Sequence, residues 1–114
     1  MSLPDFKGLL ETARRLQSEV ARVREDLGHK TVTGETGGGL VRCVANGKGE
    51  VLSLAIDPSL LPSLLPSLLG DVKMIEDLTV GAVNLALERA RELAQAELGQ
   101  ATGGLPLPPG LFGG

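Results

Sequence analysis

The side chains of this sequence best suited to catalysis are a thiol and an imidazole, and each occurs once, as Cys43 and His29. A thiolate beside an imidazole is a working nucleophile. Cys43, however, belongs to the alternating run Val41, Cys43, Ala45, which places it on the inward face of a strand, where cysteine is ordinarily an inert apolar residue. We therefore predict no catalytic dyad. We also predict no metal site, because a lone His and a lone Cys do not form a ligand set.

A glycine-rich loop and paired carboxylates are the remaining candidates for chemistry. A phosphate-binding loop needs Lys and Ser or Thr directly after its glycines, at the start of a helix, whereas the run Gly37–Gly39 precedes a strand-like segment. The carboxylates of Glu88 and Glu92 fit the solvated face of a helix better than an acid and base pair. The sequence thus predicts a protein that is not an enzyme and uses no cofactor and no small-molecule substrate.

Basic side chains near the N-terminus form rows that could reach nucleic-acid phosphates. Arg15 and Arg22 are seven residues apart, and so are Lys7 and Arg14, so each pair shares one line along a helix. Arg24 adds a fifth cation to the same segment. These five residues are the candidate phosphate contacts.

Acidic neighbours offer an alternative interpretation of the same rows. Glu11 and Arg15, Arg15 and Glu19, and Arg22 and Asp26 are each four residues apart, the spacing of ordinary ion pairs on a solvated helix. Composition alone favours this alternative, because residues 3–27 contain five acidic and five basic side chains.

Residues 3–27 must form a long helix to position these rows. Their apolar residues alternate in steps of three and four, a heptad stripe typical of a helix that packs lengthwise against another helix. The stripe consists of Phe6, Leu9, Ala13, Leu16, Val20, Val23 and Leu27. Ser2 is a candidate N-cap, and Gly28 marks the end. Such a helix is about 37 Å long, so we expect part of it to project from a small domain.

Between residues 30 and 56 the pattern changes to strand-like alternation in three runs, 30–34, 40–46 and 51–56, separated by glycine-rich connections. This pattern predicts a three-stranded antiparallel meander. The predicted buried face consists of Val41, Cys43 and Ala45 on the second run and Leu52, Leu54 and Ile56 on the third.

The remainder of the chain contains an insert, a second helix and a tail. Residues 57–70 contain three Pro-Ser-Leu-Leu repeats, and proline at every fourth position forbids one regular helix. A wide apolar stripe over 71–98, closed by Gly99, predicts a second long helix buried on two sides. Residues 103–114 are rich in Gly and Pro and are expected to be a flexible tail, which leaves 1–102 as a single α+β domain.

The size of the chain limits its core. With 114 residues and no Trp or Tyr, the core must consist of aliphatic side chains and Ala, and about 65% of the unfolded surface would be buried. The two helices carry more apolar surface than so short a chain can cover, so we expect a homodimer. The predicted core and dimer contacts are Leu16, Val20, Val41, Cys43, Leu54, Ile56, Leu78 and Leu85.

Charge and hydropathy exclude several classes of protein. The formal net charge of −3 argues on its own against an obligate nucleic-acid binder, although residues 1–50 hold eight basic against seven acidic side chains and residues 51–114 hold three against seven. No apolar run is long enough to span a membrane. A single Cys forms no disulfide within the chain, and the N-terminus lacks the features of a secretion signal, so we expect a cytoplasmic protein.

Several separated motifs carry a family resemblance. They are the run from Val32 to Arg42, the pair Asn46-Gly47, the run from Ile56 to Leu61, Glu76-Asp77-Leu78 with Asn84 and Ala86 behind it, and Leu107-Pro108-Pro109-Gly110. In this order they resemble the YbaB/EbfC family of bacterial nucleoid-associated proteins over essentially the whole chain. The chain departs from the family pattern in the Pro-Ser-Leu-Leu repeats, which lengthen the segment after Asp57-Pro58.

The resemblance implies an α-β-β-β-α protomer, a tight homodimer and DNA binding through projecting helices in the bacterial nucleoid. In a two-fold dimer each basic row occurs twice, and two arms about 34 Å apart could straddle a duplex. We therefore predict that the phosphate contacts are Lys7, Arg14, Arg15, Arg22 and Arg24. Because aromatic residues make up only 2% of the chain, stacking on single strands is disfavoured and double-stranded DNA is the expected partner.

The expected function is therefore binding of double-stranded DNA with low sequence specificity, which organises the chromosome and affects gene expression. The alternative is an interaction or scaffold protein whose apolar stripes serve assembly with itself or another protein, without DNA. The net charge of −3 favours the alternative, and the basic rows together with the resemblance favour DNA binding.

Overall fold

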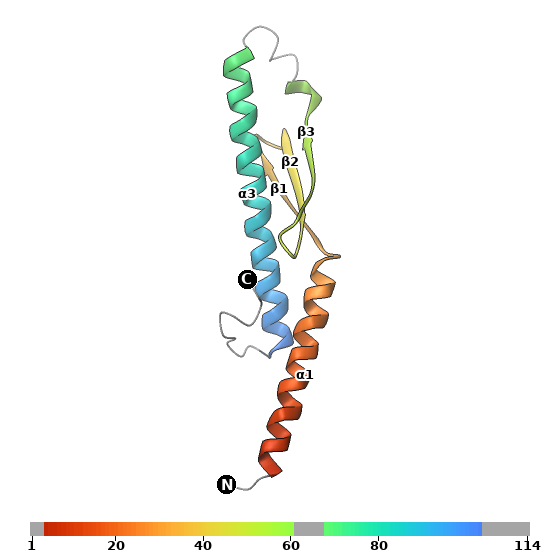
Figure 1. Ribbon diagram of the computed structural model, residues 1–114. Coiled ribbons are helices and arrows are strands. Elements are labelled where there is room, and N and C mark those ends of the chain that lie inside the picture. Colours follow the sequence, from red (N-terminus) through yellow and green to blue (C-terminus); the bar gives the residue numbers. More distant parts are fainter. Residues whose placement is uncertain (1–3, 61–67, 104–114) are drawn as a thin grey trace.

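The protein is an elongated α+β molecule with principal extents of 79 × 21 × 18 Å (Figure 1). The computed structural model describes residues 4–60 and 68–103. Its elements are, in order, α1 (Pro4–Leu27), β1 (Thr31–Thr36), β2 (Val41–Asn46), β3 (Val51–Ile56), the short 3-10 helix η1 (Pro58–Leu60) and α3 (Leu68–Ala101). The predicted α-β-β-β-α order and the antiparallel meander are confirmed.

The sheet has the strand order β1-β2-β3, with both pairs antiparallel. Cys43 at the centre of β2 lies opposite Gly34 on one side and Leu54 on the other. A bulge between Val44 and Ala45 shifts the register, so that Ala45 lies opposite Val51. Residues that face each other across a ladder point to the same face of the sheet, so one face contains the central β2 residues and the β3 residues opposite them.

Helix α3 covers this face over β1 and β2, and its small residues allow a close approach. Ala82, Ala86 and Ala90 are spaced four apart and are fully or almost fully buried. Opposite them, Gly34 lies inside β1, although the sequence had indicated a turn there. A Cβ atom at Gly34 would lie 2.5 Å from both the carbonyl oxygen of Ala82 and the amide nitrogen of Ala86. Glycine at this position therefore permits backbone contact between strand and helix.

The predicted burial of β3 is wrong for the single chain. Val41 and Cys43 are fully buried beneath α3, whereas Leu54 and Ile56 on the same face are 44% and 40% exposed. The reason is that α3 packs on β1 and β2 and leaves β3 beyond its edge. The bulge also aligns Val51, instead of Leu52, with the buried Ala45.

Helix α1 has two different halves. Its C-terminal part packs antiparallel beside the end of α3 and buries Val20, Val23 and Leu27. Its N-terminal part extends past the end of α3 (Figure 1), and Phe6 and Leu9 are 63% and 64% exposed there. The expectation that part of this helix projects from the domain therefore agrees with the structure.

Helix α3 is longer than the sequence indicated. It spans Leu68–Ala101 instead of 71–98. Proline forbids a helix only as far as Pro66, and Gly99 stays helical because one glycine costs a helix only about 1 kcal/mol. Leu78 and Leu85 of this helix are half-buried. Most of the repeat insert and the tail beyond residue 103 lie outside the described residues.

Candidate nucleic-acid interface

The five candidate phosphate contacts all lie on α1, and all five side chains are exposed. At 1.5 Å rise per residue, the seven-residue spacing of Lys7 and Arg14, and of Arg15 and Arg22, separates the members of each row by about 10 Å. Both rows lie on the half of the helix that faces away from the apolar stripe. The cations are therefore directed toward solvent.

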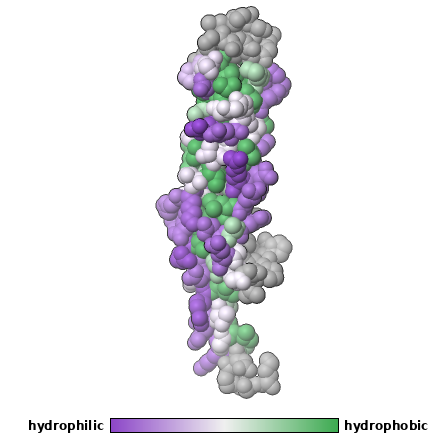
Figure 2. Space-filling view, turned by 180° about the vertical axis from the view of Figure 1, so that it is seen from behind, coloured by the Kyte–Doolittle hydropathy of each residue, from purple (hydrophilic) through white to green (hydrophobic). Residues whose placement is uncertain are grey.

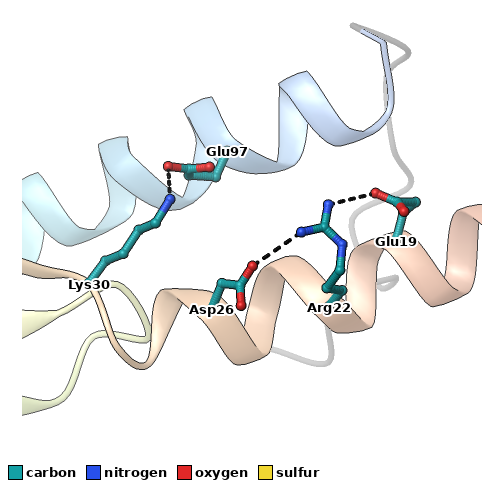
Figure 3. Close-up of polar contacts among 5 residues, drawn as sticks. All are labelled: Glu19, Arg22, Asp26, Lys30 and Glu97. Atoms are coloured by element: carbon teal, nitrogen blue, oxygen red, sulfur yellow. Dashed lines mark hydrogen bonds and ion pairs between the residues drawn. The ribbon is translucent and has the colours of Figure 1, made fainter.

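The base of α1 is fixed to the rest of the fold by backbone and side-chain contacts. The amide of Gly47, in the turn between β2 and β3, donates to the carbonyl of Leu27 at 2.8 Å. The side chain of Asn46 organises this turn by accepting from the amides of Lys48 and Glu50 at 3.0 and 3.1 Å. Just beyond the helix, the ammonium group of Lys30 pairs with Glu97 of α3 (Figure 3). The helix thus leaves the domain in a defined direction.

Arg22 is held by two carboxylates of its own helix. One guanidinium nitrogen lies 2.8 Å from Glu19 Oε2 and the other lies 3.2 Å from Asp26 Oδ2 (Figure 3). The hydrogen bond to Glu19, with the charges of Glu19 and Asp26, raises the pKa of Arg22 above its ordinary value. Arg22 therefore must leave or share these partners to contact a phosphate.

The other four candidates differ from Arg22 in this respect. Within residues 4–60 and 68–103, no ion pair involves Lys7, Arg14, Arg15 or Arg24. Of the alternative ion pairs that the spacing allowed, the pair of Arg22 and Asp26 forms, and Glu19 pairs with Arg22 instead of Arg15. The ion-paired interpretation thus describes the inner half of α1, and the phosphate-binding interpretation fits the outer half.

Arg24 points toward two cations from other elements. It lines a groove of about 890 Å³ between α1, the turn between β2 and β3, and α3, together with Lys48 and Arg91. Glu25, which lies 3.8 Å from the Lys48 ammonium group, and Glu50 line the same groove. Sequence reasoning missed Lys48 as a neighbour of Arg24, because only the folded turn brings the two together.

The basic residues of the sheet and of α3 are mostly engaged in the fold. Arg89 donates to the backbone carbonyl of Thr33, and Lys73 pairs with Asp77 one helical turn away. Arg42 pairs with Glu35 across the two strands at 2.9 Å. Of the cations on α3, Arg91 at the groove is thus the better placed for an external anion.

The catalytic alternatives have no support in the described residues. Cys43 has no exposed surface, and burial raises the pKa of its thiol. His29 is exposed beside Glu25, at 3.8 Å. The run Gly37–Gly39 forms the turn between two strands, and no cluster of three His, Cys, Asp or Glu side chains within residues 4–60 and 68–103 could hold a metal ion. Among these residues, no helix is long and apolar enough to cross a membrane.

Comparison with known proteins identifies the family of this chain. The model of the YbaB/EbfC DNA-binding family matches residues 1–105. The chain belongs to the YbaB/EbfC family. The family is described by DNA binding and not by a reaction, and the burial of the Cys43 thiol agrees with that description.

YbaB/EbfC relatives align along nearly the whole chain. A nucleoid-associated protein of Desulfotalea psychrophila is 38% identical over 104 residues, which cover 91% of this chain and 92% of that protein. A nucleoid-associated protein of Caldanaerobacter subterraneus is 38% identical over 108 residues, covering 95% and 91%. The crystal structure of an uncharacterized Helicobacter pylori protein matches the fold with a TM-score of 0.62 and 26% identity, covering 84% of this chain and 91% of that one.

Proposed function

We propose that this chain binds double-stranded DNA with little sequence specificity, as a homodimer, through the projecting part of α1. The observation that carries the proposal is the set of exposed cations Lys7, Arg14 and Arg15, which have no carboxylate partner within the described residues and lie on a helix that extends beyond the domain. Contacts of such side chains with phosphates position a protein on DNA but convey no sequence information. Low specificity follows from this.

Duplex DNA is favoured over single strands by what the arm lacks. Stacking on unpaired bases requires aromatic side chains, and the chain contains two Phe and no Trp or Tyr. The outer half of α1 carries Lys7, Arg14 and Arg15 against Asp5 and Glu11. Its local charge is therefore positive although the whole chain is negative, and binding would be steeply salt-dependent.

The proposed homodimer rests on the uncovered part of the sheet. Val51, Leu54 and Ile56 continue the buried face of β2 and are 47%, 44% and 40% exposed. β3 is also the edge strand, so its outer backbone groups have no neighbouring strand in the chain. An exposed apolar edge strand is normally covered or paired. A second copy would cover this surface and bring a second α1 arm to the same assembly.

The surface area of the chain also supports association. Its accessible surface is 7836 Å², against about 5,900 Å² for a compact monomer of this mass. Hydrophobic patches recur between hydrophilic margins along the face shown in Figure 2. Part of the excess area belongs to the elongated shape, and an apolar strand within it is the surface that a partner would remove from water.

The relatives named nucleoid-associated proteins extend the proposal to the cell. Two arms related by a two-fold axis would contact the same duplex at two places, and a protein that contacts phosphates without reading bases can act along the whole chromosome. We propose that the chain acts in the bacterial nucleoid, where such binding organises DNA and influences gene expression.

A titration of a labelled duplex tests DNA binding directly. Fluorescence anisotropy with a duplex of about 30 base pairs, at about 50 and about 200 mM salt, should show affinity that falls by orders of magnitude at the higher salt. Arg14→Glu with Arg15→Glu should abolish binding and leave the oligomeric state unchanged. Absence of binding at the lower salt would contradict the proposal and would favour the alternative of an assembly protein without DNA.

Light scattering tests the homodimer separately. The expected mass is twice the 11.8 kDa of the chain, and Leu54→Glu should shift it to the monomer, because a charge cannot be buried unpaired at an apolar interface. Ser53→Glu adds the same charge to the opposite face of β3 and serves as the matched control. A monomer mass for the unchanged protein at micromolar concentration would refute the homodimer.

A further inference from the structure

The apolar stripe of α1 is covered over only half of its length. Val20, Val23 and Leu27 are buried against α3, whereas Phe6 and Leu9 on the same stripe are 63% and 64% exposed. Figure 2 shows hydrophobic surface near the free end of α1. The uncovered part therefore continues an existing helix-to-helix interface beyond the point where its partner helix ends.

The chain's own α3 does not extend far enough to cover it. The amide of Thr102 donates to Leu98 and that of Gly103 to Gln100, which closes the last turn. Gly103 then has a φ of 66°, a left-handed conformation that terminates a helix. A partner helix for the outer half of α1 must therefore come from another molecule.

We propose that the outer half of α1 pairs antiparallel with the same segment of a second copy. The pattern of steps of three and four is that of a helix packed along another helix, and α1 already packs in this way on α3. A pairing centred between Leu9 and Ala13 places Leu9 opposite Ala13 and Phe6 opposite Leu16 of the other copy. Each layer then combines a larger side chain with a smaller one, and the two-fold symmetry repeats every layer.

The cations remain accessible in this arrangement. Lys7, Arg14 and Arg15 lie on the half of the helix away from the stripe, so pairing leaves them directed toward solvent. Each outer half carries a small positive charge, so two of them repel weakly in the absence of an anion. DNA phosphates would neutralise that charge and favour pairing.

The pairing is weak by itself and acts through multiple contacts. The paired segment is shorter than the roughly 12 to 15 residues that an isolated helix needs for stability, so the contact adds modestly to association between free molecules. On DNA, where many copies are held close together, the effective concentration is high. Arms of two DNA-bound molecules would then join two duplexes. This consequence rests on the proposed DNA binding, whereas the pairing itself does not.

Site-specific cross-linking tests the pairing and its direction without DNA. Cys43 is the single cysteine and is fully buried, so cysteines introduced on α1 are the reactive ones. Leu9→Cys mixed with Ala13→Cys, one of them carrying a tag, should cross-link with a short bis-maleimide about tenfold faster than Leu9→Cys with itself, because the pairing sets their effective concentration. Ser18→Cys lies away from the stripe and is the matched control.

Two results would overturn the proposal. Faster linkage of Leu9→Cys with itself would show that the arms run parallel, and linkage no faster than that of Ser18→Cys would show that they do not pair. Neither result depends on DNA, and variants with Arg14 and Arg15 replaced by Gln should cross-link at least as fast. Failure of the arm pairing is thus distinguishable from failure of the proposed DNA binding.

A capture assay then tests the consequence on DNA. An immobilised duplex should capture a second, labelled duplex in the presence of the protein. Leu9→Glu should reduce capture about tenfold, since a carboxylate is costly in an apolar seam, and should bind a single duplex as well as the matched variant Ser18→Glu. Equal capture by both variants would contradict the arm-to-arm contact.

Discussion

The two halves of α1 have the same sequence pattern and different surroundings. The inner half has its apolar stripe buried against α3, and its Arg22 is bound by Glu19 and Asp26. The outer half has an exposed stripe, and Arg14 and Arg15 have no ion-pair partner within the described residues. One continuous helix therefore combines a structural half with a half that is free to bind.

This difference arises from where α3 ends, and not from α1 itself. The stripe repeats without interruption from Phe6 to Leu27, so periodicity shows only that a partner is needed. The charges do differ between the halves: three cations face two acids in residues 4–18, and two cations face three acids in residues 19–27. Local charge balance is thus the feature of the sequence that separates the two halves.

The largest expected difference between the halves is in stability. Leu27→Ala should lower the free energy of unfolding by about 2 to 5 kcal/mol, because it leaves a cavity at a buried site. Leu9→Ala should change it by less than about 0.5 kcal/mol, since the side chain is 64% exposed. Chemical denaturation followed by circular dichroism measures both changes. A large loss for Leu9→Ala at low protein concentration would mean that the outer half is already covered.

DNA affinity should show the opposite ranking. Arg14→Ala with Arg15→Ala should lower affinity about tenfold or more and reduce the log–log salt slope by about one unit for each phosphate that is no longer neutralised. Arg22→Ala should lower affinity by less than about threefold, because Arg22 gives up Glu19 and Asp26 to bind a phosphate. Anisotropy titrations at several salt concentrations measure both the affinity and the slope. An equal loss of affinity for Arg22→Ala would assign DNA binding to the whole helix.

Releasing Arg22 should have a smaller effect in the opposite direction. Glu19→Gln with Asp26→Asn removes both carboxylates from its guanidinium group and should raise affinity about two- to fivefold at low salt. Glu88→Gln with Glu92→Gln removes the same charge from α3 and is the control for net charge. If both double variants raise affinity equally, the ion pairs of Arg22 do not restrict it.

The sequence predicted the elements better than it predicted their contacts. Alternation at Val41, Cys43 and Ala45 identified the buried face, and the residues are fully buried in the structure. It did not show that α3 covers only two of the three strands, because the position of a helix across a sheet depends on long-range packing. The small-residue spacing of Ala82 and Ala86 was the available sign of a close approach, and it lies opposite Gly34.

The candidate site was predictable in position but not in detail. Seven-residue spacing placed the cations along one helix, and the structure locates them there. The choice of Glu19 between Arg15 and Arg22 could not be read from the sequence, because both spacings allow a pair and side-chain geometry decides. The same applies to the meeting of Arg24 with Lys48 and Arg91, which lie on three different elements.

The smallest expected effect concerns the ion pair at the base of the arm. Lys30 and Glu97 are 45% and 27% exposed, and pairs of this kind contribute about 0.2 to 1 kcal/mol and weaken with salt. A double-mutant cycle with Lys30→Ala and Glu97→Ala should give a coupling energy in this range, falling between low and high salt. Apolar burial at Leu27 and the amide of Gly47 would then account for most of the anchoring. A coupling energy above about 2 kcal/mol would instead make this pair the main link that holds the inner half in place, and the direction of the arm would depend on salt.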